Sequence, residues 1–211
     1  MIDFSLYLIT DRMQTAGRTL PAVVADALRG GLQVVQLREK DLSSSQLYEL
    51  AGDLRRITQD FGAQLLINDR IDIALAVGAD GVHLGQSSIP VAVARRILGS
   101  DQIIGYSAHA LDEAQQAERD GADFVTFGPV YATPSKAAYG EPLGLARLAE
   151  VSQSLSIPVL ALGGVKKSSV EEVLSVGAWG IAVISAIIAA QDPADETAAL
   201  LRTIADHDNH S

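Results

Sequence analysis

The chain has 211 residues, 48% of them hydrophobic and 20% charged, which is enough to bury one sizeable core and fits one domain over residues 1–211 better than two. Its formal net charge of −10 argues against a nucleic-acid partner or an anionic membrane partner. The absence of cysteine excludes disulfides and thiolate metal sites and suits a reducing cytosol, so we expect a cytoplasmic protein.

The sequence shows neither a secretory signal nor a membrane span, which fits this expectation. The first residues carry Asp3 and no basic region of the kind that begins a secretory signal. The longest apolar stretch, residues 181–190, is too short to span a bilayer and contains Ser185. The sequence leaves open whether the chain forms a homo-oligomer.

Eight short apolar runs follow one another along the chain and predict eight strands. Most of them are apolar on successive residues, which is typical of strands buried on both faces in a parallel sheet. Helical stretches separate them, and several end in glycine, a helix stop signal. The predicted strands are residues 6–11, 34–40, 65–69, 81–85, 103–109, 124–130, 159–165 and 180–187, and the clearest helices are 20–31, 44–62, 90–99, 111–121 and 168–177.

Eight strand–helix units predict a single-domain α/β protein, a (β/α)8 TIM barrel. The turn Gly-Ala-Asp recurs before two predicted strands, at 78–80 and 121–123, and Gly-Ala-Trp precedes the last at 177–179. The main alternative is an open doubly wound sheet. It is disfavoured because no G-x-G-x-x-G follows the first strand and only one helix follows the last.

Polar residues gather where the predicted strands end, which is where TIM barrels build their active sites. Each has a structural explanation when taken singly. Asp11 or Ser88 could cap a helix, and His83, between two apolar neighbours, fits a core histidine. Together they predict one site. The residues are Asp11, Gln36, Arg38, Lys40, Asn68, Asp69, Gln86, Ser107, His109, the segment 128–136, Gly163, Gly164, Ile184 and Ser185.

The donors in this set are suited to a diphosphate. Three cations, two amides and two hydroxyls converge in an otherwise acidic protein: Arg38, Lys40, Lys136, Gln36, Asn68, Thr133 and Ser135. Asp69 among them could hold a Mg²⁺ ion that bridges the diphosphate. A second anion could bind the glycines after the seventh strand, beside Ile184 and Ser185. The alternative is that Arg38 and Lys40 form surface ion pairs with Glu39 and Asp41.

Seven motifs carry a family resemblance over nearly the whole chain. They are YLITD (7–11), QLREK (36–40), LLINDRIDIALAVGADGVHLGQ (65–86), GYSAH (105–109), GPVYATPSK (128–136), ALGGV (161–165) and VISAI (183–187). In this order they resemble the superfamily of thiamine-phosphate synthase and thiazole tautomerase, and the chain is most similar to the synthases.

The resemblance implies a transferase of thiamine biosynthesis with Mg²⁺ as cofactor and two small-molecule substrates. Hydroxymethylpyrimidine diphosphate loses pyrophosphate, and the nitrogen of thiazole phosphate captures the methylene cation to give thiamine phosphate. The resemblance assigns diphosphate binding to Gln36, Arg38, Lys40, Asn68 and Lys136, further substrate contacts to Ser107, Thr133 and Ser135, the thiazole-phosphate pocket to Gly164, Ile184 and Ser185, and one metal ligand to Asp69. We expect Arg38, Lys136, Ser107 and His109 to be the catalytic residues.

One segment departs from the family pattern. Synthases usually read G-Q-x-Asp after the fourth strand, with that Asp as the second Mg²⁺ ligand, whereas this chain has Ser88 there. A hydroxyl is a poorer Mg²⁺ ligand than a carboxylate. Tautomerases also lack that Asp and use a histidine at the position of His109 to move a proton. The tautomerase is therefore the alternative function, and a non-catalytic barrel that binds thiamine or a phosphate ligand is a third.

Overall fold

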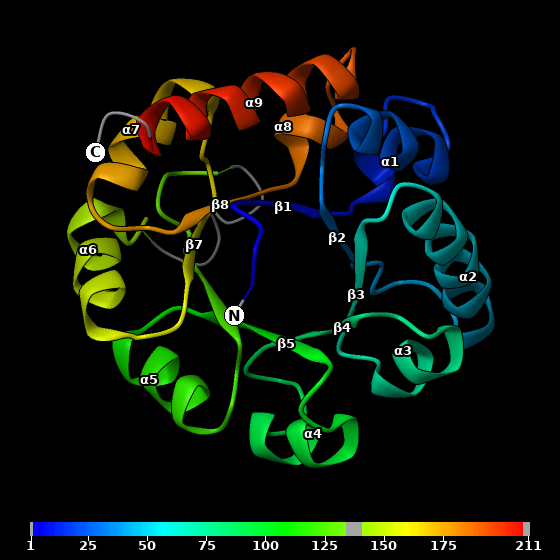
Figure 1. Ribbon diagram of the computed structural model, residues 1–211, viewed down its shortest axis with the longest axis horizontal. Coiled ribbons are helices and arrows are strands. Elements are labelled where there is room, and N and C mark those ends of the chain that lie inside the picture. The colour runs from blue at the N-terminus through cyan, green and yellow to red at the C-terminus, as the bar shows by residue number, and fades with distance from the viewer. Residues whose placement is uncertain (1, 134–140, 209–211) are drawn as a thin grey trace.

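The computed structural model describes residues 2–133 and 141–208, and these form a closed barrel of parallel strands surrounded by helices (Figure 1). The strands pair in chain order from β1 to β8, and β8 pairs with β1 to close the barrel. The predicted (β/α)8 fold is therefore confirmed. The strands are β1 (Leu6–Ile9), β2 (Val34–Leu37), β3 (Gln64–Asn68), β4 (Gly81–Leu84), β5 (Ile103–Ala108), β6 (Phe124–Phe127), β7 (Val159–Leu162) and β8 (Gly180–Val183).

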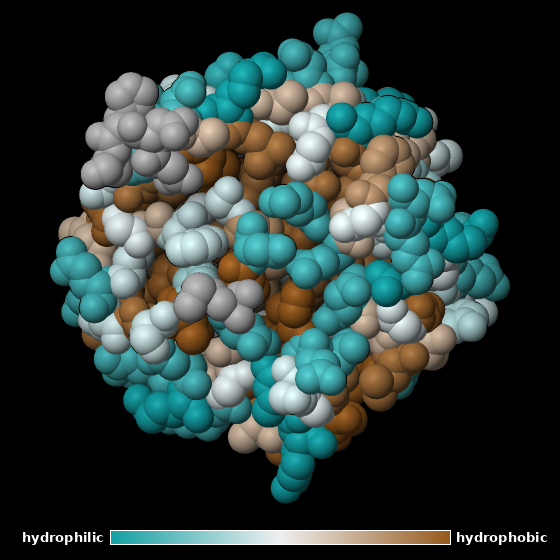
Figure 2. Space-filling model, in the orientation of Figure 1, coloured by the Kyte–Doolittle hydropathy of each residue, from teal (hydrophilic) through white to brown (hydrophobic). Residues whose placement is uncertain are grey.

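The helices form a ring outside the strands, with α9 packed mainly on α1 and α7 (Figure 1). Hydrophilic side chains occupy much of the margin of the molecule, and hydrophobic ones show mainly between them (Figure 2). No helix in the described part of the chain is long and apolar enough to cross a membrane. The helices are α1 (Leu20–Arg29), α2 (Ser44–Asp60), α3 (Ile71–Val77), α4 (Val91–Leu98), α5 (Leu111–Arg119), α6 (Gly144–Ser154), α7 (Val170–Ser175), α8 (Ser185–Ile188) and α9 (Pro193–Asp208), with short 3-10 turns η1 (Arg12–Gln14) and η3 (Lys167–Ser169).

The core has two parts. The larger lies between the strands and the helices, and the smaller fills the barrel interior. Aromatic side chains dominate the interior: Phe4 and Tyr7 each form a T-shaped pair with Phe124, with ring centroids 5.4 and 5.3 Å apart. Ile2 and Phe4 precede β1, so the N-terminal segment packs into the same interior cluster and helps to close the barrel there.

The strands end earlier than the apolar runs predict, and the prediction is wrong for the end of the last run. Residues 184–187 were expected in a strand, but β8 ends at Val183 and Ser185–Ile188 is the helix α8. The backbone N–H of Ile188 donates to the carbonyl of Ile184 at 2.9 Å, a helical bond. A short apolar run has no period that separates a buried strand from a buried helix, and this explains the error.

The recurrent Gly-Ala-Asp turns tie neighbouring strands together at the end of the barrel where strands begin. Asp80, just before β4, accepts hydrogen bonds from the backbone N–H of Leu65 and from Arg55, at 2.7 and 2.6 Å. Asp123, just before β6, makes the same kind of contacts with β5 and α4. Before β8 the acid is replaced by Trp179, whose indole N–H donates to the Phe4 carbonyl at 2.9 Å. These turns support the barrel at the end opposite the polar strand ends.

Candidate active site

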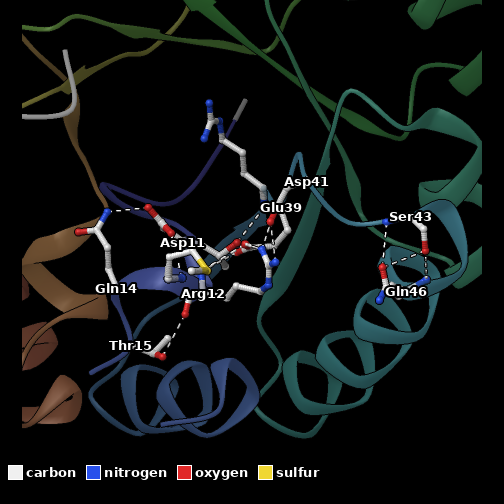
Figure 3. Close-up of polar contacts among 11 residues, drawn as sticks. Asp11, Arg12, Gln14, Thr15, Glu39, Asp41, Ser43 and Gln46 are labelled. Atoms are coloured by element: carbon white, nitrogen blue, oxygen red, sulfur yellow. Dashed lines mark hydrogen bonds and ion pairs between the residues drawn. The ribbon is translucent and has the colours of Figure 1, made fainter. Parts of the chain in front are cut away.

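The loop after β2 is fastened to the loop after β1 by Arg12 (Figure 3). The Arg12 guanidinium donates two hydrogen bonds to the Asp41 carboxylate, both of 2.6 Å, and a third of 3.3 Å to Glu39. The backbone N–H of Arg12 also donates to the carboxylate of Glu39, a residue that is only 6% exposed. The hydrogen bonds from the Arg12 guanidinium lower the pKa of the Asp41 carboxyl below its ordinary value. We call this unit of Arg12, Glu39 and Asp41 the clamp.

The clamp bears on the alternative reading of the QLREK segment, in which Arg38 and Lys40 form ion pairs with Glu39 and Asp41. Glu39 and Asp41 are both bound to Arg12, so Arg38 and Lys40 do not form the surface ion pairs with them that the alternative reading expected. Burial of Glu39 turns its two neighbours outward, and both are exposed. The backbone N–H of Arg38 donates to the buried hydroxyl of Thr10 at 2.9 Å, which fixes where the segment leaves β2.

Asp69 lies at the centre of a second polar group, directly after β3. Its carboxylate accepts hydrogen bonds from the Asn68 amide at 2.7 Å and from the Ser88 hydroxyl, and the Lys40 ammonium is 3.6 Å away. Asp69 has a left-handed backbone with φ +62°, which is uncommon for a residue other than glycine. The hydroxyl of Ser88 in turn accepts from the backbone N–H of Gly85 at 2.8 Å.

This group has one carboxylate to offer a metal. The described residues hold no cluster of three or more His, Cys, Asp or Glu side chains that would bind a metal ion. Mg²⁺ prefers oxygen ligands and commonly keeps several waters, so one carboxylate and the oxygens of a bound diphosphate form a set that fits it. Ser88, at the usual position of the second ligand, contacts Asp69 through its hydroxyl.

Gln36 and Ser107 belong to a buried polar chain that crosses the barrel interior. The Gln36 amide donates to the Tyr7 hydroxyl at 2.9 Å, and that hydroxyl lies 3.2 Å from His83 Nδ1. His83 Nε2 is 2.9 Å from the Ser107 hydroxyl. Gln36 is 1% exposed, so it lies deeper than the rim position that its place in the sequence suggested.

Burial keeps the His83 imidazole neutral. Desolvation lowers its pKa from 6.5 to about 3, with a smaller opposing effect from Asp69 and a lowering effect from Arg38. Arg38 follows the end of β2 and Asp69 follows the end of β3, so both charges lie at the same end of the barrel. Burial likewise raises the pKa of the Tyr7 phenol far above its ordinary value. The interpretation of His83 as a core histidine is correct as to burial, but His83 also touches a predicted site residue.

His109 lies at the rim, beyond the end of β5. Its Nδ1 is hydrogen-bonded to the Gly128 carbonyl, and its backbone N–H donates to Glu113 at 2.8 Å. A carbonyl oxygen only accepts hydrogen bonds, so Nδ1 of His109 must carry a proton. Asp11, by contrast, has the structural role considered for it: it caps η1, accepting from the Met13 N–H at 3.0 Å.

The loop after β7 supports the second anion site only in part. Gly163 and Gly164 have φ +94° and +69°, a backbone that favours glycine. A Cβ on Gly164 would lie 2.7 Å from Cβ of Tyr131, so packing against the loop after β6 already requires glycine there. Ile184 and Ser185 follow β8, which pairs with β7, so both loops leave the barrel side by side at one end.

Of the remaining predicted residues, Gln86 is exposed in the loop after β4, and the others lie in or beside the segment after β6. Thr133 is half-buried at the end of the described part of that segment. Ser135 and Lys136 fall outside the described residues, and their predicted roles stay predictions.

Three residues of the site were not singled out from the sequence: Arg12, Tyr7 and Thr126. Tyr7 and Thr126 are polar residues on fully buried strands that are otherwise apolar, a pattern that signals hydrogen bonding inside the barrel. Arg12 directly follows the YLITD motif, but its partners are 27 and 29 residues away, and nothing local to Arg12 indicates them.

Comparison with known proteins assigns the family. The family model described as thiamine monophosphate synthase matches residues 6–187. A putative thiamine-phosphate synthase of Geobacter sulfurreducens is 60% identical over 95% of this chain and 94% of its own length, and a thiamine-phosphate synthase of Clostridium novyi is 49% identical over 90% and 94%. The solved structure of a thiamine phosphate pyrophosphorylase from Pyrococcus furiosus is 38% identical with a TM-score of 0.88, covering 96% of each chain. The chain belongs to the thiamine monophosphate synthase family.

Proposed function

We propose that this chain is a transferase that joins hydroxymethylpyrimidine diphosphate to thiazole phosphate, giving thiamine phosphate and pyrophosphate. Membership of the family and the names of its relatives support this activity. The structural observation that carries it is the clamp. Because Arg12 binds Glu39 and Asp41, these two acids are engaged by Arg12, while Arg38 is exposed and Lys40 faces Asp69, the residue that would hold the metal.

The leaving group explains the residue types. When the bond from the methylene carbon to the diphosphate oxygen breaks, its electron pair leaves with the diphosphate. Arg38, Lys40 and the Asn68 amide, with Lys136 from the segment after β6, would stabilise that charge, and such stabilisation is commonly the largest contribution to catalysis. The thiazole nitrogen then forms the new bond to carbon, so no strong general base is needed.

Asp69 is the residue that would contribute a protein ligand to Mg²⁺. The ion would neutralise part of the charge on the diphosphate when it is bound. The Lys40 ammonium lies 3.6 Å from the Asp69 carboxylate, so a diphosphate bound beside Asp69 would be within reach of the same lysine. The phosphate of the second substrate is assigned to Gly164, Ile184 and Ser185, where the β7 and β8 loops emerge together.

The test is a two-substrate assay for thiamine phosphate, run with and without Mg²⁺. We expect product only when both substrates are present. Arg38→Ala should lower turnover by at least ~100-fold, because it removes a charge-assisted donor aimed at developing negative charge. Arg29→Ala is the matched control, since Arg29 is an exposed arginine paired with Asp26 on the outer helix α1.

Two results would contradict the proposal. One is the absence of thiamine phosphate from a folded wild-type protein supplied with both substrates and Mg²⁺. The other is a wild-type rate in Arg38→Ala, with folding confirmed by circular dichroism. The tautomerase is examined in parallel by deuterium exchange into a thiazole carboxylate phosphate, with His109→Gln as the variant expected to abolish any exchange.

A further inference from the structure

The polar chain inside the barrel has a fixed direction. The Gln36 amide nitrogen can only donate, so the Tyr7 oxygen accepts from it at 2.9 Å. The Tyr7 hydroxyl proton is then directed to its other neighbour, His83 Nδ1, at 3.2 Å. A ring nitrogen that accepts carries no proton, so the neutral imidazole carries its proton on Nε2.

His83 Nε2 therefore donates to Ser107. Two hydroxyls lie near this nitrogen, Ser107 at 2.9 Å and Thr126 at 3.4 Å, and the shorter contact identifies Ser107 as the main acceptor. Gly105 makes room for this arrangement, since a Cβ there would lie 2.5 Å from His83 Nδ1.

Ser107 is the member of the chain that reaches the site. Gln36, Tyr7, His83 and Thr126 are all buried, whereas Ser107 is only partly so and lies at the C-terminal half of β5. Its oxygen accepts the proton of His83 Nε2–H, so its own hydroxyl proton is left to be donated. Thr126, at 3.3 Å, is a more distant acceptor than a substrate atom in direct contact with Ser107 would be.

We propose that His83 is a positioning residue: as the Nε2–H tautomer fixed by Tyr7, it orients Ser107 so that the serine hydroxyl donates to an acceptor on the bound pyrimidine. This inference rests on the proposed function for the identity of the substrate. The partners of Ser107 within the barrel are uncharged, a neutral imidazole and the Thr126 hydroxyl, which suits a neutral ring acceptor better than the diphosphate. Each member of the chain donates a hydrogen bond to the next: Gln36 to Tyr7, Tyr7 to His83, His83 to Ser107, and Ser107 to the substrate.

The first experiment observes the tautomer and does not depend on turnover. Protein labelled with ¹⁵N at histidine is examined by long-range ¹H–¹⁵N correlation, with the His83 signals assigned by elimination using His109→Gln, His207→Gln and His210→Gln, since the chain has four histidines. We expect a protonated Nε2 and an unprotonated Nδ1 in the wild type, and a mixture of tautomers in Tyr7→Phe. A wild-type Nδ1–H tautomer, or a mixture already present in the wild type, would overturn the proposal.

The second experiment asks whether Tyr7 acts through Ser107. Tyr7→Phe, Ser107→Ala and the double variant are compared by kcat/KM for the pyrimidine substrate, with unfolding in urea measured separately. Tyr7→Phe should lose about fivefold, the usual weight of one neutral hydrogen bond, and should lose nothing further when Ser107 is already alanine. Tyr106→Phe is the matched control, because Tyr106 precedes Ser107 on β5 and packs on the outer face of the barrel.

Failure of this inference differs from failure of the proposed function. If the wild-type protein forms no thiamine phosphate, the same cycle is run on the binding of hydroxymethylpyrimidine diphosphate by calorimetry. Losses that multiply in the double variant, in rate or in binding, would show that Tyr7 and Ser107 act independently and would overturn the positioning role. If a variant does not fold, the tautomer of His83 measured in the wild-type protein decides whether the positioning role holds.

Discussion

Ser88 shapes the metal chemistry open to this site. Its hydroxyl donates to Asp69 and accepts from Gly85, so the loop after β4 is attached to the loop after β3 without a second negative charge. A carboxylate in its place would face Asp69 closely and would be repelled unless a cation lay between them. Serine at this position therefore permits the loops to close in the absence of metal.

We predict that Mg²⁺ binds weakly to the free protein and tightly only with pyrophosphate present. Among the described residues, Asp69 is the single carboxylate of its group with Asn68, Lys40 and Ser88, and a Mg²⁺–diphosphate complex supplies most of the other oxygen ligands itself. Ser88→Asp should bind Mg²⁺ without pyrophosphate and should need less Mg²⁺ for half-maximal activity. Without metal, Ser88→Asp should be less stable than the wild type by about 1 kcal/mol, through like-charge repulsion.

Titration calorimetry with and without pyrophosphate measures the binding, and urea unfolding measures the stability. Ser87→Asp is the control. Ser87 is exposed, and the substitution adds the same charge one residue away from the contact with Asp69. The prediction is wrong if the two variants behave alike, since Ser88 would then not face the metal.

At the scale of the element, the clamp couples the ends of β1 and β2. We predict that Arg12→Ala lowers kcat/KM for the pyrimidine substrate by about tenfold, because the segment that presents Arg38 and Lys40 loses three side-chain hydrogen bonds. Arg12→Lys should not restore the rate, since an ammonium cannot reproduce the bidentate contact with Asp41. The change in unfolding free energy should stay below about 2 kcal/mol, as expected for a partly exposed ion pair.

Steady-state kinetics and urea unfolding on the same preparations separate the two effects. Arg29→Ala again serves as control, because it removes an exposed arginine–carboxylate pair far from the β2 loop. A rate unchanged in Arg12→Ala, or a loss matched by Arg29→Ala, would show that the clamp does not position the cations.

The comparison of sequence with structure is also clearest at this scale. The apolar runs predicted all eight strands, because a buried parallel strand must be apolar on both faces. They could not predict where a strand ends and a helix begins, as residues 184–187 show. The polar residues at the strand ends were predicted to share one rim, and the structure brings Lys40, Asn68, Asp69 and Ser88 together.

The depth of a side chain and its distant partners were not predictable from the pattern. Gln36 is two residues from Arg38, yet Gln36 lies in the interior and Arg38 is exposed, because β2 ends at Leu37 and Arg38 belongs to the loop that follows. Arg12 was missed since its role depends on acids that only the closed barrel brings near. Hydrogen bonds between β1, β4 and β5 depend likewise on the barrel register, which single-strand patterns do not contain.

At the scale of the whole molecule, the neutral imidazole in the barrel interior makes stability depend on pH. His83 contacts side chains of β1, β5 and β6, so protonating it disturbs the centre of the barrel and not one loop. Burial lowers its pKa from 6.5 to about 3 in the folded state. Below pH 6.5 the unfolded chain binds a proton that the folded chain does not, so the contribution of this group is complete above that pH and is lost as pH falls toward 3.

We predict that protonation of His83 lowers the unfolding free energy of the wild type as the pH falls from 6.5 toward 3. The decrease that His83 causes should reach up to about 1.4 kcal/mol per pH unit. Urea unfolding from about pH 7.5 down to about pH 4.5 measures the slope. In His83→Gln the slope should be shallower by that amount, whatever the stability of the variant at neutral pH, because glutamine does not titrate. His109→Gln, which removes a histidine from the exposed rim, should keep the slope that His83 causes. Equal slopes in the wild type and His83→Gln would mean that the barrel admits a charged imidazole at its centre, and the direction assigned to the chain from Gln36 to Ser107 would then not hold in acid.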